Sequence, residues 1–227
     1  MRGLPFPFGL FVAVALVAAL SPAGASAQDV PASADASATF QHRIDPPPPP
    51  ETLPPDVNLD IRGAAIVPLY RDALCPGDHQ CVLNGGVGVS VGVERRWADG
   101  WGFLSRYDVW VLDAGALYEI GTMHSVRIGA RYVIDATTNV HPYLEALAGF
   151  LAFGDTTTVA AVGGSVTLSA GTEIELTDIL ALDVGAELWT FATSFFATRD
   201  GVRRSDGFGA NLALQIFVGL EVLLGTF

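Results

Sequence analysis

The sequence predicts an all-β fold, an eight-stranded antiparallel up-and-down transmembrane β-barrel, and three observations lead to it. From Val57 onward, eight short stretches carry an apolar residue at every second position, with most charges on the opposite positions. The connections between the stretches are alternately long and short. An export signal stands at the N-terminus. Period-two patterning gives a sheet two unlike faces, and with export and alternating connections it is typical of barrels in an outer membrane.

Residues 1–27 have the pattern of a secretory signal peptide. Arg2 supplies a positive charge, residues 8–20 form an apolar run of about thirteen residues, and Ala25-Ser26-Ala27 is a small-x-small cleavage pattern. The run is shorter than the about 20 apolar residues of a spanning helix. No cysteine stands at the end of this run, which argues against a lipoprotein anchor. We expect cleavage after Ala27, with a retained N-terminal anchor as the alternative.

Residues 28–56 are expected to be a disordered Pro/Ala-rich periplasmic linker. The segment is rich in Ala, Ser and Asp and then carries five consecutive prolines at 46–50, followed by Pro54 and Pro55. It has few large apolar residues to offset the entropy of ordering, and its prolines favour extended polyproline II. A spacer role is the simplest interpretation. Contact with peptidoglycan or a periplasmic partner is the alternative.

The charge balance limits the partners of the chain. Loss of Arg2 with the signal changes the formal charge from −12 to −13, and every basic side chain is an arginine. A strongly negative chain is a poor partner for nucleic acid. Among the mature residues the only cysteines, Cys75 and Cys81, lie close together in an exported protein, so we expect a disulfide. A metal site that adds Asp78 and His79, or a reduced pair, is the alternative.

In the first four predicted strands, apolar residues occupy one parity and charged residues the other. The second strand alternates valine with glycine or serine, and Ala98-Asp99-Gly100 is a hairpin signal that joins it to the third. A loop with the cysteine pair precedes the second strand, and another loop precedes the fourth. These strands are residues 57–69, 86–94, 101–112 and 126–132. Their inward charges are Asp60, Arg62, Glu94, Arg106, Asp108, Arg127 and Arg131.

The last four predicted strands repeat the pattern with longer apolar rows. Asp155 and Thr156 mark the loop between the fifth and sixth strands, and Thr177-Asp178 is the tightest turn. A long loop, residues 192–207, precedes the last strand. These strands are residues 144–150, 166–176, 180–188 and 211–224. Their inward charges are Glu145, Glu173, Glu175, Asp183, Glu187 and Glu221.

The apolar face is expected to touch lipid. Period two alone does not separate this arrangement from a soluble lipocalin-type barrel with an apolar interior. The charged face, however, combines glycine with paired arginine and carboxylate, as a narrow lumen does, while the apolar face is wide and almost free of charge. Aromatic residues fall near strand ends, where interfacial anchors belong. These residues are Tyr70, Trp97, Trp101, Tyr132 and Phe191.

From residue 57 to its end, the chain resembles the small eight-stranded outer-membrane barrels of the OmpA, OmpX and OmpW type. The resemblance lies in topology and in the last strand, which that family presents to the barrel-assembly machinery. Gly219, Val222 and Leu224 fit its glycine-x-x-apolar-x-apolar pattern, and Phe227 supplies the aromatic end. Phe217 departs from it, because a polar residue is usual there. The resemblance implies a Gram-negative outer-membrane protein without a peptidoglycan-binding domain, and we expect a monomer.

The expected function is structural or surface-interacting, with the lumen filled by the inward charges. An eight-stranded lumen is only wide enough for side chains, and buried charges need partners. The alternative is a narrow, porin-like small-solute channel that weakly prefers cations, because carboxylates outnumber arginines. We expect outer-membrane lipid and lipopolysaccharide as partners. Arg199, Arg203 and Arg204 in the last loop are candidates to contact lipopolysaccharide phosphates, although a solvated loop is the simpler interpretation.

Catalysis is not expected, and neither a cofactor nor a metal is. A lipid-modifying barrel enzyme, the third reading, would need a nucleophile, a base and an orienting acid at the outer rim. His124-Ser125 is the one such pairing in the barrel region, and a histidine beside a serine is usually incidental. The glycines of residues 85–92 suit small inward positions and precede no helix, so they do not predict a phosphate-binding loop.

Overall fold

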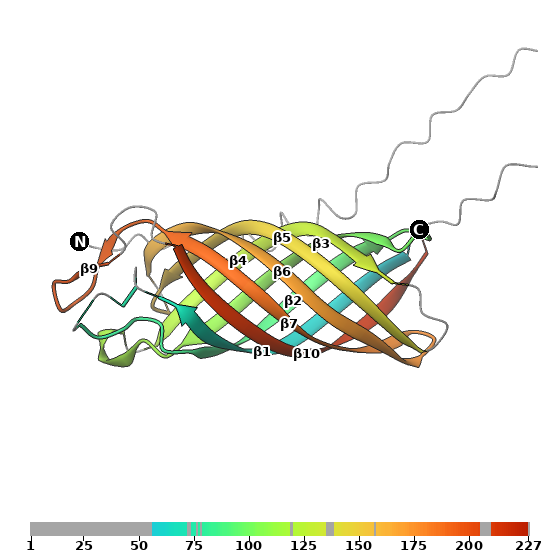
Figure 1. Cartoon of the computed structure of the whole chain (residues 1–227), viewed down its shortest axis with the longest axis horizontal. Helices are drawn as coiled ribbons and strands as arrows, with labels where there is room; N and C mark the ends of the chain where they lie inside the picture. Colours follow the sequence, from blue (N-terminus) through green and yellow to red (C-terminus); the bar gives the residue numbers. More distant parts are fainter. Residues whose placement is uncertain are drawn as a thin grey trace, which may run out of the picture.

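Eight long strands close into a single antiparallel barrel in the computed structural model (Figure 1). The structure describes residues 56–71, 74, 75, 77, 79–118, 120–134, 139–156, 158–204 and 210–226. Consecutive strands are neighbours around the wall, and the last one returns to pair with the first. The barrel strands are β1 (Asp56–Tyr70), β2 (Gly86–Arg96), β3 (Trp101–Leu112), β4 (Gly121–Val133), β5 (Val140–Gly154), β6 (Val159–Thr177), β7 (Leu180–Thr193) and β10 (Ala210–Thr226). The predicted fold class is confirmed.

Three short elements lie outside the wall. A 3-10 helix, Gly115–Leu117, stands between β3 and β4, and β8 (Phe196–Ala197) pairs with β9 (Arg203–Arg204) as a small hairpin. This β8–β9 hairpin was not predicted, because residues 192–207 read as a plain loop. Among the described residues, no helix is long and apolar enough to cross a membrane. The predicted signal peptide, nearly all of the linker and Phe227 lie outside the described residues.

The two ends of the barrel differ. The short-turn end carries the β2–β3, β4–β5 and β6–β7 connections, and the strand termini Asp56 and Thr226 also lie there. At Gly100 φ is +85°, a left-handed conformation that explains the glycine in this tight turn. The loop end carries the β1–β2, β3–β4, β5–β6 and β7–β10 connections, and the β8–β9 hairpin projects beyond the wall there (Figure 1). The β5–β6 connection was expected to be long, but it spans only residues 155–158, because both strands extend further than predicted.

The two faces of the wall follow the predicted parity. The outward row is exposed and apolar, while charged residues of the inward row are buried. Outward members include Ile61, Val89, Val91, Ile128, Leu144, Phe150, Val166, Leu168, Leu188, Ile216, Val218 and Leu220. Of the five aromatics predicted at the interfaces, Tyr70, Trp97, Trp101 and Tyr132 are exposed. The prediction for Phe191 is wrong: it is buried in the interior beside Trp189, because β7 keeps its inward parity to Thr193.

Candidate functional site

The barrel interior holds one connected network of charged side chains. Among the described residues it contains five guanidinium groups and eight carboxylates, so carboxylates are in excess. Buried charges are stable only when they are paired and hydrogen-bonded, and most of these groups meet more than one partner. The members are Arg62, Arg96, Arg106, Arg127, Arg131, Asp60, Glu94, Asp108, Glu145, Glu173, Asp183, Glu187 and Glu221.

The structure corrects two points of the predicted lumen set. Arg96 at the end of β2 belongs to the network, although it was not among the predicted lumen residues. Glu175 does not belong to it: its side chain is exposed and lies 3.1 Å from the ring of His141. Glu175 keeps the inward parity of Glu173, but β6 has passed the end of β5 at this point, so the side chain lies at the mouth of the barrel and not within the enclosed lumen. The remaining predicted members are buried inside the barrel.

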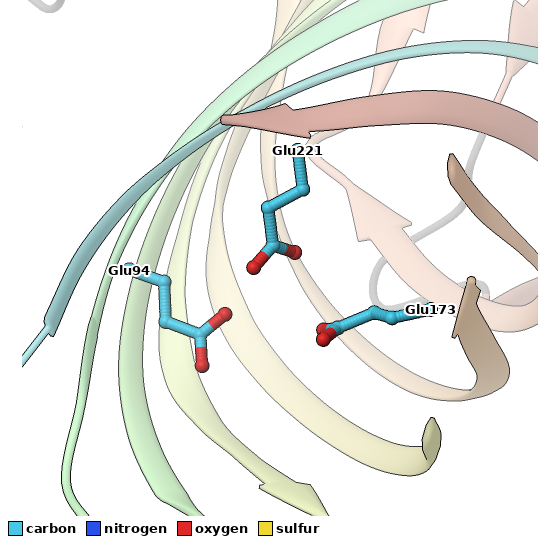
Figure 2. Close-up of side chains that lie close together, drawn as sticks. All are labelled: Glu94, Glu173 and Glu221. Carbon is cyan, nitrogen blue, oxygen red and sulfur yellow. The ribbon is translucent and has the colours of Figure 1, made fainter. Parts of the chain in front are cut away.

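Three glutamates converge near the short-turn end (Figure 2). Glu94, Glu173 and Glu221 come from β2, β6 and β10, and one carboxylate oxygen of each lies within 4.8 Å of the others. Two guanidiniums separate these charges. Arg96 reaches Glu94, Glu173 and Glu221 at 2.9, 2.7 and 2.9 Å, and Arg131 reaches the same three at 2.9, 2.7 and 2.9 Å. The geometry by itself resembles a carboxylate cation site, but the arginine side chains supply the cations.

Glu145 joins this group to the middle of the barrel. Its carboxylate lies 2.9 Å from Arg131 and 2.6 Å from Arg106. Arg62 stands between Asp60 at 2.9 Å and Asp183 at 2.6 Å. The guanidinium of Arg62 also stacks on the ring of Phe217, 4.4 Å from its centroid, which gives this inward phenylalanine a function in the network.

Arg127 ends the network toward the loop end. It pairs with Asp108 at 2.8 Å and also with Glu187. Its guanidinium carbon lies 5.8 Å from the ring centroid of Trp189, where the interior becomes apolar. The charged part of the lumen therefore borders directly on a hydrophobic part.

The loop-end half of the interior is a hydrophobic cluster, which was not predicted from the sequence. Trp110 and Trp189, with ring centroids 5.9 Å apart, pack there with wall residues and with residues of the covering loops. Leu74, Val82, Leu83, Leu117 and Phe196 are the covering residues. The signal was available, because Trp110 shares the inward parity of Arg106 and Asp108. Buried charged side chains therefore lie toward the short-turn end of the interior, and buried apolar side chains lie toward the loop end.

The loops that cover the cluster are tied to one another. Cys75 and Cys81 form a disulfide within the β1–β2 loop. Arg204 of the β8–β9 hairpin is fully buried and donates a 2.8 Å hydrogen bond to the carbonyl oxygen of Leu74 in that loop. It also pairs with Asp200 at 3.0 Å. Arg204 therefore links the β8–β9 hairpin to the β1–β2 loop. Because its side chain is buried, the expectation that it contacts lipopolysaccharide is wrong.

The one candidate catalytic pairing is split by the wall. Ser125 is buried on the inside and donates a 2.6 Å hydrogen bond to Asp108. His124 is on the opposite face, where its Nδ1 lies 2.8 Å from the hydroxyl of Tyr107. Adjacent residues of a strand point to opposite faces, so the histidine cannot serve as the base for this serine.

Comparison with solved structures places the fold. Neisserial surface protein A is similar with a TM-score of 0.52 at 14% identity, over 74% of this chain and 96% of that chain. OprG from Pseudomonas aeruginosa has a TM-score of 0.52 at 10% identity, over 77% of this chain and 98% of that chain. The outer membrane protein AlkL, in lipid bilayers, has a TM-score of 0.50 at 9% identity, over 89% of this chain and 98% of that chain.

The fold of this chain is thus that of the small eight-stranded outer-membrane β-barrels, as the sequence resemblance implied. At these identities the likeness extends to the fold alone. No protein-family model and no curated protein matches the sequence.

Proposed function

We propose that this chain is an outer-membrane barrel with a structural or surface-interaction role, its lumen closed to solutes and its longer loops at the cell surface. The observation that carries the proposal is the filled interior. Charged side chains of the network and the apolar cluster beyond it are nearly all buried, so the described residues include no continuous row of solvated groups along a path between the ends. Conduction through a barrel requires a wet, accessible path.

Planar-bilayer recording tests this closure. Refolded protein in a bilayer is expected to give no unitary conductance steps, while a general porin in the same bilayer serves as the positive control. Reproducible cation-preferring steps would instead favour the narrow channel, whose support is the excess of interior carboxylates over guanidiniums.

Epitope insertion tests location and orientation. A tag inserted at Gly201, in the turn of the β8–β9 hairpin, is expected to bind antibody on intact cells. The same tag inserted between Asp99 and Gly100, in the β2–β3 turn, should bind only after the outer membrane is permeabilised. The opposite accessibility, or no difference between the two insertions, would contradict the proposed placement.

A further inference from the structure

The β8–β9 hairpin has two different faces. Its inner face is fixed, since Phe196 packs on Phe153, with ring centroids 5.7 Å apart, and Arg204 is fully buried. Its outer face carries Phe195 and Arg203, which are exposed and in contact with each other, and the exposed Arg199 follows in the turn of the hairpin. The hairpin is therefore held in place from within, while an aromatic ring and two guanidiniums stay on the surface.

Phe195 stands at the rim of the lipid-facing surface. The preceding Ser194 donates a 2.7 Å backbone hydrogen bond to the carbonyl oxygen of Val162 and accepts a 3.2 Å bond at its hydroxyl from the Val162 amide. Val162 is an exposed outward residue near the loop end of β6. Phe195 is itself exposed, and the guanidinium carbon of Arg203 lies 5.1 Å from its ring centroid. An aromatic ring at the loop-end rim of the wall, with a guanidinium over its face, matches the boundary between hydrocarbon and head groups.

The charges of this face are not neutralised by the described part of the protein. Within it, neither Arg199 nor Arg203 takes part in an ion pair, and the nearby Asp200 is already bound by Thr198, Val202 and Arg204. Two exposed guanidiniums without a carboxylate partner among the described residues are unexpected in a chain of formal charge −12. Guanidiniums bind phosphate oxygens through charge-assisted, often bidentate hydrogen bonds.

We propose that the outer face of the β8–β9 hairpin, formed by Phe195, Arg199 and Arg203, binds the phosphorylated head group of an outer-leaflet glycolipid. This inference rests on the proposed outer-membrane placement. Phe195 lies against the upper acyl chains and positions Arg203, which contacts the phosphate together with Arg199. The buried Arg204 keeps the hairpin in the binding geometry.

Titration of lipopolysaccharide into the folded barrel in a zwitterionic detergent tests the site, with thermophoresis as the readout. Arg203→Glu is expected to raise the apparent Kd about tenfold, because an attraction to phosphate becomes a repulsion. Phe195→Ala should raise it less, and Arg203→Lys should retain much of the binding. Arg95→Glu is the matched control, because Arg95 in β2 lies at the short-turn end of the barrel.

Three results would overturn the inference: unchanged binding by Arg203→Glu, an equal loss in Arg95→Glu, or equal binding of lipopolysaccharide stripped of its phosphates. Full competition by inorganic phosphate alone would identify a free anion instead of a lipid and would overturn it as well. Heat-modifiable gel mobility reports folding of every variant. A wild-type chain that stays folded and dissolved without amphiphile contradicts the proposed function, whereas an inserted barrel indifferent to Arg203 contradicts only this inference.

Discussion

Glu145 is the carboxylate on which the interior charges converge. It lies 2.6 Å from Arg106, 2.9 Å from Arg131 and 3.6 Å from Arg62. Glu145→Gln keeps the shape but removes the charge, so three guanidiniums lose their common counter-ion. Removing one partner of a buried ion pair costs about 3–5 kcal/mol, and we expect a loss of that size in the free energy of unfolding.

Urea unfolding of the barrel in lipid vesicles measures this loss. Glu175→Gln is the matched control, since the same charge is removed from an exposed side chain. Its effect is expected to stay within about 0.5 kcal/mol. Equal losses in the two variants would mean that the network does not stabilise the barrel.

Asp200 makes the stability of the β8–β9 hairpin depend on pH in the acid range. The hydroxyl of Thr198 donates to the carboxylate and, with the Val202 amide and the Arg204 guanidinium, lowers the pKa of Asp200 below its ordinary value of 3.8. A lowered pKa stabilises the fold fully above the ordinary value, and this contribution is lost as pH falls through the folded-state pKa. The hairpin should therefore loosen only in acid below a pH of about 3.8.

Amide hydrogen-exchange protection at Gly201 and Val202 is the measurement. Protection in the wild type is expected to fall in this acid range, and Asp200→Asn should show reduced protection that no longer varies there. An identical acid dependence in Asp200→Asn would assign the effect to another group.

At the scale of single strands, glycine makes room for the charge network. Gly92 of β2 faces inward and pairs with Asp60 of β1. A Cβ at this position would overlap the carboxylate of Asp60, which is held by Arg62 and Arg106. Gly92→Ala is therefore expected to lower the free energy of unfolding by about 1–3 kcal/mol, the range for overpacked interiors.

Gly63→Ala provides the comparison on the other face of the wall. A Cβ at Gly63 meets nothing within 4 Å, and a strand gains from losing the flexibility of glycine. We expect this variant to be as stable as the wild type or slightly more so in the same urea titration. A larger loss in Gly63→Ala than in Gly92→Ala would refute the steric explanation.

Strand parity was readable from the sequence, because a slip of one residue would move every side chain to the wrong face. Asp60, Arg106 and Glu187 therefore lie inside, as their positions predicted. The prediction failed for Glu175 at a strand end, because this residue keeps the inward parity but lies beyond the end of β5, where its side chain is exposed. Strand length was also underestimated: β6 begins at Val159 rather than residue 166, since Gly163-Gly164 interrupts the apolar alternation.

The residues of the site were mostly predictable from parity, but their partners were not. Partners inside the barrel come from strands far apart in the sequence, such as Arg96 with Glu173 or Arg131 with Glu221, and alternation alone does not choose among them. The hydrophobic cluster depends on loops that fold back over the lumen. Arg204 illustrates this, since its partner Leu74 is 130 residues away and no local pattern indicates the contact.

For the whole molecule, the two faces of the wall have opposite environments. The outer face presents a continuous apolar surface, and the interior contains nearly all the charged side chains of the strands. In a soluble barrel this arrangement would expose a hydrophobic surface much larger than monomeric proteins tolerate. In a membrane, hydrocarbon covers the apolar outer face. The interior charges are stable because they pair with one another.

A charge introduced on the outer face at different depths tests this conclusion. Leu168 is at the centre of β6 and Leu176 is near its short-turn end, and their side chains are similarly exposed at 60% and 53%. In a bilayer, arginine costs about 2–4 kcal/mol at the midplane but only about 0–1 kcal/mol near the interface. Leu168→Arg should therefore lower the free energy of unfolding in vesicles by the larger amount and Leu176→Arg by the smaller. Equally small effects would mean that the outer face does not touch hydrocarbon, because solvent exposure alone does not distinguish the two sites.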